Sequence, residues 1–439
     1  MESRWTPPSG SGSDDQRATH TATRTAHSVI DSAKPNCRAG TPGAHVAAER
    51  ATLTVSATDV ADLQGRLAGT RWPRTWPSTS PNRGGSAKPD ATTDRADPSR
   101  DAALVRRLAR AWQQHYDWPG HETVINALPS FLVEIDGTPV HFLRYDGESD
   151  EALPIVITHG WPSSFLEMIE LAQRLSTPSR YGGDPSDSFT VIAPSLPGFG
   201  LSPQRPELPA GAPTHGLWHR LMHDHLGFAR YAAHGGDLGA GVTSLLAQDY
   251  PDAVVGVHLL AVADPADFDV ATLTDAESAY LDSTKLWFAE AGGYEHEQMT
   301  RPVTLSYGLT DSPVALLAWI VEKYREWSDC DGDVSRCFSD DFLLTQASLY
   351  WFTNSISTSF RPYFEYAQGW RTDVQRVEVP TAVAVFPKDL TRPPRSWAAR
   401  TYNVTRYTEM PRGGHFAAYE QPELLASDLI EFFGELLKA

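Results

Sequence analysis

An alternation of short apolar runs with helix-length segments is the feature that most constrains the fold. Four runs are bounded by loops, at residues 154–158, 189–193, 231–234 and 254–260. Short continuous apolar runs are typical of strands buried on both faces, as in a parallel sheet covered by helices. The pattern returns at 381–386 and 402–408, and an amphipathic helix at 422–437 closes the chain. The sequence therefore predicts an α/β fold with a mostly parallel central sheet.

A long segment interrupts this alternation before the last two runs. Residues 266–376 are rich in aromatic side chains and mostly helical in pattern. One helix is expected at 314–327, after the start signal Ser312-Pro313. We therefore predict a helical cap inserted into the core.

The first 145 residues follow a different pattern. Residues 1–48 are rich in Ser, Thr, Ala, Gly, Pro and Arg without periodicity, which is typical of a disordered leader. The next segment predicts a helix at 59–71, a polar and Pro-rich loop at 74–100, a helix at 102–116 and a hairpin at 131–144 that turns at Asp136-Gly137.

A lone carboxylate lies on a turn between an expected strand and an expected helix. Asp237 stands within His-Gly-Gly-Asp-Leu-Gly-Ala, residues 234–240. Its small neighbours have the spacing that surrounds the catalytic serine of α/β-hydrolases, where they allow a strained turn that exposes one side chain. A carboxylate in that place is most simply a nucleophile. Its covalent product is an alkyl ester, so we expect an electrophilic sp³ carbon with a leaving group, as in epoxides or alkyl halides.

Hydrolysis of that ester requires a general base and a carboxylate that orients the base. His415 lies in a Gly-rich loop after the last expected strand, and Asp389 follows the strand before it. The order nucleophile, acid, histidine is that of α/β-hydrolases. Asp264, which follows the run at 254–260, is the competing acid, and position favours Asp389.

Backbone donors are also needed to stabilise the tetrahedral intermediate. The N–H groups of Leu238 and Trp161 are the candidates for this oxyanion hole. Trp161 belongs to a His-Gly-Trp-Pro turn after the first core strand. We expect the pocket to be lined by other residues of that turn and by a second tight loop: His159, Gly160, Pro162 and Phe199.

Composition excludes several partners. The 439 residues carry a formal net charge of −18, and such a surface repels nucleic acid and anionic membranes. The three cysteines show no C-x-x-C spacing, so we expect neither a disulfide framework nor a zinc site. No stretch reaches the roughly 18 apolar residues of a membrane span, and no secretory signal is recognisable. We expect a cytoplasmic protein, without a membrane anchor, that acts on a small apolar molecule.

Two clusters resemble metal sites but lack a required residue. His219 and His223 lie one helical turn apart, without the glutamate of an H-E-x-x-H motif. The acidic run from Asp329 to Asp333 resembles a calcium loop, but Val334 stands where that loop needs glycine. A polar helix face and an exposed acidic loop are the favoured interpretations, and we expect no metal ion.

Several motifs together resemble one known family. They are Arg71-Trp72-Pro73, the turn at 159–162, the Ser-Leu-Pro-Gly-Phe-Gly loop at 195–200, the Asp237 turn and the run at 413–420. From about residue 53 onward, the chain resembles the microsomal-type epoxide hydrolases of the α/β-hydrolase superfamily. Leu238 departs from the pattern, because many relatives have tryptophan there, and no membrane anchor like that of the animal members is visible.

The resemblance implies two tyrosines of the cap that bind the epoxide oxygen and protonate it as the ring opens. By motif context they are Tyr294 and Tyr363, with Tyr366 as the rival of Tyr363. It also implies an N-terminal meander that packs on core and cap, so the expected domains are a leader (1–48), a meander (49–145), the first part of the core (146–265), the helical cap (266–376) and the second part of the core (377–439).

The sequence predicts an epoxide hydrolase that needs no cofactor and converts an apolar epoxide and water into a vicinal diol. An aryl epoxide is one option for this substrate. A haloalkane or haloacid dehalogenase is the nearest alternative, because it shares the aspartate nucleophile and the histidine. A non-catalytic protein that binds a hydrophobic ligand or docks on an assembly is the third. Detoxification and a step of natural-product biosynthesis both stay open, as does a homodimer.

Overall fold

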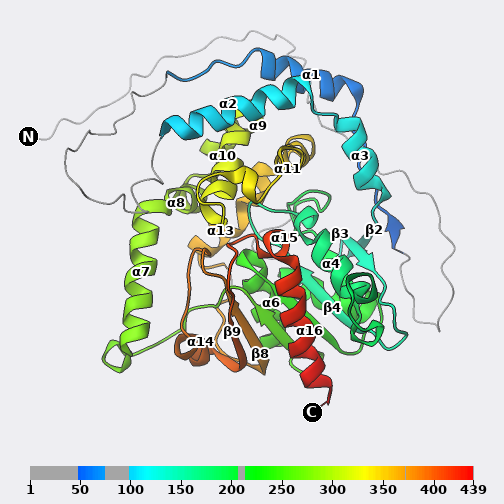
Figure 1. Ribbon diagram of the computed structural model, residues 1–439, viewed down its shortest axis with the longest axis vertical. Coiled ribbons are helices and arrows are strands. Elements are labelled where there is room, and N and C mark those ends of the chain that lie inside the picture. The colour runs from blue at the N-terminus through cyan, green and yellow to red at the C-terminus, as the bar shows by residue number, and fades with distance from the viewer. Residues whose placement is uncertain (1–47, 75–97, 206–212, 371, 439) are drawn as a thin grey trace, which may run out of the picture.

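The computed structural model describes residues 48–74, 98–205, 213–370 and 372–438. Within these ranges a nine-stranded sheet, ordered β1-β2-β3-β5-β4-β6-β7-β8-β9, forms the centre of the molecule (Figure 1). The strands β5, β4, β6, β7, β8 and β9 run parallel, and β1, β2 and β3 extend the sheet in antiparallel pairs. The predicted α/β fold with a mostly parallel sheet is therefore confirmed. The strand bounds are β1 (Glu49–Arg50), β2 (Ser130–Ile135), β3 (Thr138–Tyr145), β4 (Leu153–Thr158), β5 (Phe189–Pro194), β6 (Tyr231–Gly235), β7 (Val254–Leu259), β8 (Val377–Val385) and β9 (Tyr402–Glu409).

Helices cover both faces of the sheet. Ile155 and Ile157 of β4 pack into the same apolar cluster as α4 and α16, whereas Val156 between them packs into the cluster that contains α5 and α6. Successive side chains of a strand point to opposite faces, so a strand covered on both faces is apolar at every position. The helices of the core are α4 (Ile169–Ser176), α5 (Thr214–His219), α6 (Asp237–Asp249), α14 (Arg395–Thr401), α15 (Ala417–Glu420) and α16 (Pro422–Lys438).

The cap is inserted between β7 and β8 and lies above the sheet in Figure 1. Its longest apolar helix, α10, begins after Ser312, whose hydroxyl accepts a hydrogen bond from the Ala315 N–H, and Pro313 occupies the first turn. This start agrees with the predicted one, because serine caps the free N–H groups and proline has none to satisfy. The cap helices are α7 (Asp275–Ala291), α8 (Gly293–Thr300), α9 (Pro302–Asp311), α10 (Pro313–Trp327), α11 (Asp340–Thr353), α12 (Ile356–Ser359) and α13 (Arg361–Ala367).

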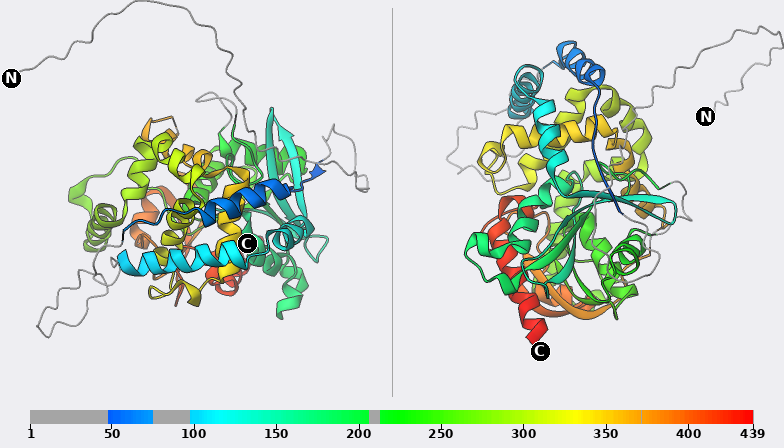
Figure 2. Two further views of the ribbon diagram at one scale, coloured as in Figure 1. Left: turned by 90° about the horizontal axis from the view of Figure 1, so that it is seen from above. Right: turned by 90° about the vertical axis from the view of Figure 1, so that its right-hand side faces the viewer.

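The N-terminal segment contacts both cap and core (Figure 2). Its helices α1 (Ala57–Ala68) and α2 (Pro98–Gln114) pack on α10, and α3 (Trp118–Ala127) leads into the hairpin β2–β3, which joins the core sheet. The predicted hairpin is confirmed, and Asp136 and Gly137 both have the positive φ that its tight turn requires.

The bounds predicted for two helices of this segment are wrong. The first helix ends at Ala68 rather than Arg71. Its last turn is closed by hydrogen bonds that the Gly69 N–H donates to the Gly65 carbonyl and the Thr70 hydroxyl donates to the Leu67 carbonyl. The second helix runs over Pro98–Gln114 instead of 102–116. Residues 1–47 of the predicted leader and 75–97 of the predicted loop lie outside the described residues.

Short helical turns complete the chain: η1 (Phe165–Met168), η2 (Pro178–Tyr181), η3 (Pro185–Asp187), η4 (Arg220–His225), η5 (Val270–Thr272) and η6 (Val334–Arg336). Among the residues that the structure describes, no helix combines the length and apolar character that crossing a bilayer requires.

Candidate active site

Asp237 stands on a strained turn between β6 and α6. Its φ is +48°, a left-handed conformation that costs energy for any residue with a Cβ. Gly239 makes this turn possible, because a Cβ there would collide with the Thr158 carbonyl. Gly160 faces Asp237 from the neighbouring loop, and a Cβ at Gly160 would collide with the carboxylate itself. The glycines around the turn thus leave room for one carboxylate to project from the sheet edge.

Backbone donors surround that carboxylate. The Trp161 N–H donates to Asp237 Oδ1 at 2.8 Å. Leu238 lies in the first turn of α6, where N–H groups have no partner within the helix. Of the two groups proposed for the oxyanion hole, the Trp161 N–H thus contacts the Asp237 carboxylate, and the Leu238 N–H follows Asp237 directly in the chain.

His415 and Asp389 meet at the same edge of the sheet. His415 Nε2 lies 3.5 Å from Asp237 Oδ2, and His415 Nδ1 lies 2.7 Å from Asp389 Oδ1. Asp264 is oriented elsewhere, since its Oδ1 accepts a hydrogen bond from the Trp397 indole at 3.0 Å. The structure thus brings together Asp237, His415 and Asp389. Asp264, the competing acid, contacts Trp397 instead.

The charges of this group determine the protonation of the histidine. Burial alone would lower the pKa of His415, but the negative charges of Asp389 and Asp237 and their hydrogen bonds outweigh burial and hold this pKa well above its usual value. At neutral pH the resting His415 is therefore an imidazolium between two carboxylates. Loss of the Asp237 charge would lower its pKa.

Two phenols of the cap pack on the ring of Trp161, whose N–H donates to Asp237. The Tyr294 ring lies parallel to the Trp161 indole with centroids 5.2 Å apart, and the Tyr363 ring meets the same indole edge-on at 6.0 Å. Their own centroids are 6.3 Å apart. Tyr366 is 61% exposed, so of the two rival residues on α13 only Tyr363 points into the molecule.

Burial and the nearby Asp237 charge raise the pKa of both phenols well above the usual value. Each therefore keeps its proton over the neutral range. Within the described residues the Tyr363 hydroxyl has no hydrogen-bond partner. Because buried polar groups are normally paired, this hydroxyl is suited to bind an oxygen of a ligand.

A cavity of about 20 Å³ adjoins Asp237 and His415, which is room for one water molecule. Two of the predicted pocket residues, His159 and Gly160, line it, and so does Glu167, whose pKa burial raises to about 7. Sequence reasoning missed Glu167, which lies on η1 eight positions after His159 and carries no motif signal of its own.

The other two predicted pocket residues do not line this cavity. The Phe199 ring packs on the His159 ring at 5.3 Å, and the Pro162 carbonyl accepts a hydrogen bond from Gln346 at 3.5 Å. Their contacts support the loops around the site. His159 itself holds both loops, since its Nδ1 pairs with the Gly160 carbonyl and its Nε2 accepts the Leu196 N–H.

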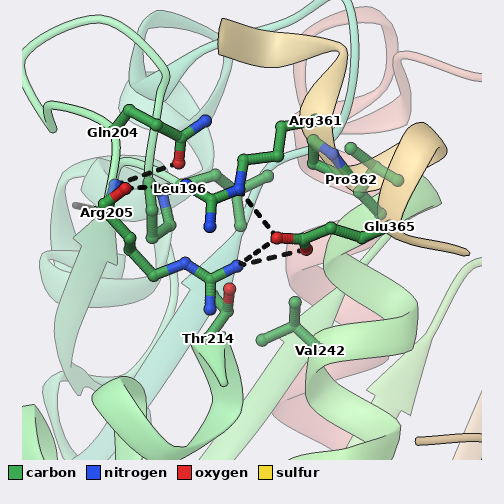
Figure 3. Close-up of a pocket in the computed structure, with 10 residues that line it drawn as sticks. Leu196, Gln204, Arg205, Thr214, Val242, Arg361, Pro362 and Glu365 are labelled. Atoms are coloured by element: carbon green, nitrogen blue, oxygen red, sulfur yellow. Dashed lines mark hydrogen bonds and ion pairs between the residues drawn. The ribbon is translucent and has the colours of Figure 1, made fainter. Parts of the chain in front are cut away.

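Leu238 borders a second small cavity, at the junction of core and cap (Figure 3). Arg205 of the core and Arg361 of α13 both point toward Glu365, with closest N–O distances of 3.2 and 2.8 Å. All three side chains are nearly buried. This ion cluster ties the core to α13, the helix that carries Tyr363.

The end of α10 also holds the histidine loop. The His415 N–H donates to the Trp327 carbonyl at 2.8 Å, and the Gly413 N–H donates to Asp329 Oδ2 at 2.9 Å. Glu420 accepts the Asp329 N–H at 2.7 Å. The acidic run at 329–333, expected as an exposed loop, thus contributes one residue, Asp329, that connects the cap to the loop carrying His415.

In the described ranges no group of three or more His, Cys, Asp and Glu side chains is placed to hold a metal ion. The His219 ring lies over Tyr250 with centroids 3.7 Å apart, and its Nδ1 pairs with the Tyr231 hydroxyl. His219 and His223 therefore belong to a polar and aromatic packing face.

Sequence comparison relates the chain to known proteins. A family profile described as "Epoxide hydrolase N terminus" matches residues 48–168, and one described as "alpha/beta hydrolase fold" matches residues 154–291. Epoxide hydrolase 1 of Oryctolagus cuniculus is 33% identical to this chain over 75% of this chain and 79% of its own length.

Structure comparison gives the same family. The structure of Aspergillus niger epoxide hydrolase matches with a TM-score of 0.72 and 29% identity, covering 88% of this chain and 95% of the other. The crystal structure of juvenile hormone epoxide hydrolase from the silkworm Bombyx mori matches with a TM-score of 0.72 and 29% identity, over 88% and 94% of the two chains. With the α/β-hydrolase fold and the sequence relatives, these matches show that the chain belongs to the epoxide hydrolase family and is an epoxide hydrolase.

Proposed function

We propose that this enzyme opens an apolar epoxide to a vicinal diol through a covalent alkyl ester on Asp237. The observation that carries the proposal is that the Asp237 carboxylate lies 3.5 Å from His415 of the His415–Asp389 pair and is bound by the N–H of Trp161, the residue on whose ring both cap phenols pack. Each part of that arrangement supplies one requirement of the reaction: a nucleophile, an acid for the leaving oxygen and a base for water.

In the first step the epoxide oxygen accepts hydrogen bonds from Tyr294 and Tyr363. One Asp237 oxygen bonds to a ring carbon, and the C–O bond of that carbon breaks. The ring oxygen takes a phenolic proton, because an alkoxide is a poor leaving group at neutral pH. The phenolate then recovers a proton, which His415 releases once the Asp237 charge is gone.

The second step uses the neutral His415. Its Nε2 takes a proton from water, and the hydroxide attacks the carbonyl carbon of the ester while the N–H groups of Trp161 and Leu238 stabilise the oxyanion. Cleavage of the bond between the acyl carbon and the substrate oxygen releases the diol, because that oxygen takes the remaining proton of the attacking hydroxyl. Asp237 returns as a carboxylate and His415 as an imidazolium, so the pair begins and ends each cycle with the same net charge.

Two alternatives from the sequence have less support. A dehalogenase needs donors for a halide, but Leu238 offers no side-chain N–H, and the Trp161 indole N–H donates to Ser359 Oγ at 3.2 Å. A non-catalytic binding protein would not require a base, an acid and a strained nucleophile in contact. Incubation with simple alkyl halides is expected to release no halide.

An apolar and in part aromatic epoxide fits the rings around the nucleophile. The centroid of the Phe360 ring lies 6.3 Å from that of Trp161. The centroid of the Trp287 ring lies 6.5 Å from that of Tyr294. Two other aromatic side chains of the cap do not contribute: Phe352 packs on Trp118, and Phe288 is 47% exposed. The aromatic character of the site therefore comes from a few rings close to Asp237.

A single turnover in heavy-oxygen water tests the covalent route. With enzyme in excess over styrene oxide, we expect the first diol to contain no heavy oxygen and Asp237 to gain one atom, because water adds to the ester carbonyl. Mass spectrometry of the diol and of the Asp237 peptide reads both. Heavy oxygen in the first diol, with none in the protein, would contradict the proposal.

The two steps are expected to depend on pH in different ways. Ester formation should stay nearly level up to about pH 10, since the raised pKa of Tyr294 and Tyr363 keeps both phenols protonated. Ester hydrolysis should fall as the pH falls, because an imidazolium cannot accept a proton. Its midpoint should lie below the pKa of His415 in the free enzyme, since the ester has lost the Asp237 charge. Rapid-quench kinetics of each step and NMR titration of His415 measure these values, and a hydrolysis midpoint at or above the free-enzyme pKa would refute the charge argument.

A further inference from the structure

A lysine is buried in the cap beside the catalytic tyrosine. Lys323 lies on α10 and is only 3% exposed. Its Nζ is 2.6 Å from Glu322 Oε1, but the Glu322 side chain is 39% exposed. Lysine side chains are rarely buried, because the ammonium loses its hydration. An ion pair between Lys323 and Glu322 could form with both side chains at the surface. The pair therefore does not explain why the Lys323 ammonium points inward.

Aromatic rings surround the buried ammonium. Nζ lies 4.8 Å from the centroid of the Tyr294 ring, 5.5 Å from that of Trp319 and 5.7 Å from that of Trp327. These distances are within the range of cation–π interactions, which are strongest when the cation is desolvated. The closest ring is the one that the proposed mechanism uses as an acid.

We propose that Lys323 is a positioning residue that acts through Tyr294, where its ammonium stabilises the negative charge that the ring gains when the phenol protonates the opening epoxide. The inference rests on the proposed function, since it assigns Tyr294 the role of proton donor. A phenolate has more negative charge on its ring than a phenol, so a cation over the ring favours the state reached during ring opening.

The surroundings of Tyr294 make such a cation useful. Burial and the charges of Asp237 and Glu295 all disfavour the Tyr294 phenolate. During ring opening the Asp237 charge passes into a neutral ester, but burial and Glu295 still oppose the phenolate. The Lys323 ammonium, 4.8 Å from the centroid of the Tyr294 ring, opposes both effects.

The experiment compares the variants Lys323→Met and Lys323→Arg with the parent enzyme. We expect Lys323→Met to slow ester formation about 10- to 30-fold while ester hydrolysis changes less than about 2-fold. Lys323→Arg keeps the charge and should retain most of the rate. Glu322→Gln is the matched control, because it removes the ion pair and leaves the ammonium over the ring; it should form the ester at least as fast as the parent.

A double-mutant cycle with Tyr294→Phe identifies the route of the effect. If Lys323 acts through the phenol, Lys323→Met should not slow ester formation further in the Tyr294→Phe background, where Tyr363 alone supports the reaction. Additive losses, an equal slowing of hydrolysis, or a Glu322→Gln variant as slow as Lys323→Met would each overturn the inference and indicate a packing role. If Lys323→Met fails to fold, Lys323→Gln replaces it in the same cycle.

Ester formation on Asp237 in the parent enzyme is measured first, by intact mass after rapid quenching with excess styrene oxide. Absence of the ester would overturn the proposed function, and this inference with it. An ester that forms equally fast in the parent and in Lys323→Met would overturn this inference alone.

Discussion

Replacing Asp237 with asparagine is expected to lower epoxide turnover by about 10⁴-fold or more. An amide oxygen is a far weaker nucleophile than a carboxylate, and the remaining groups cannot form an ester without it. Steady-state kinetics with styrene oxide measures the loss. Intact mass should show no alkylated protein.

Two variants make this test specific. Asp249→Asn removes a carboxylate from the other end of α6, where Asp249 pairs with His215 at 2.9 Å, and should leave turnover nearly unchanged. Asp237→Ala excludes recovery of activity by deamidation of the new asparagine. Substantial turnover in Asp237→Ala would rule out a covalent role for this side chain.

Replacing His415 with glutamine is expected to separate the two steps. Ester hydrolysis should fall by about 10³-fold, because glutamine cannot take the proton from water as the imidazole of His415 does. Ester formation should persist, since it needs Asp237 and the phenols. The enzyme should therefore accumulate a covalent adduct whose added mass equals that of the epoxide, visible within the first turnover.

His223→Gln is the matched control, since His223 is exposed on η4 and should leave both steps unchanged. Failure of His415→Gln to accumulate an adduct, with turnover close to that of the parent, would show that another group activates water. Glu167, which borders the same cavity, would then be the next candidate base.

Local patterns were sufficient to predict most elements of the core. The runs at 154–158, 189–193, 231–234 and 254–260 are all strands, because burial on both faces requires a continuous apolar sequence that is easy to recognise. The ends of helices were less predictable. Arg71 continued the expected helix, but the Gly69 cap ended it at Ala68. The end of a helix depends on a few backbone hydrogen bonds, and the spacing of apolar residues along the sequence does not predict them.

The positions of the candidate site residues followed from chain order and motif. Asp237 and His415 lie next to glycines on loops after strands, and this arrangement is visible in the sequence. The choice between Asp389 and Asp264 was different, since both follow strands of the same sheet. Position favoured Asp389, and the contacts settle the choice: Asp389 lies 2.7 Å from His415, whereas Asp264 accepts a hydrogen bond from Trp397. The same holds for Tyr363 and Tyr366, which lie on one short helix and differ in burial.

By itself the sequence determined the order of strands and helices, the glycine-walled turn at Asp237 and the family, because these depend on local residue types and spacing. The tertiary structure decided which acid meets His415, which phenol of α13 turns inward, and that Lys323 lies over Tyr294 and Asp329 holds the Gly413 loop. Those contacts join residues far apart in the chain. Their geometry depends on how the elements of cap and core pack together. Local sequence patterns do not predict that packing.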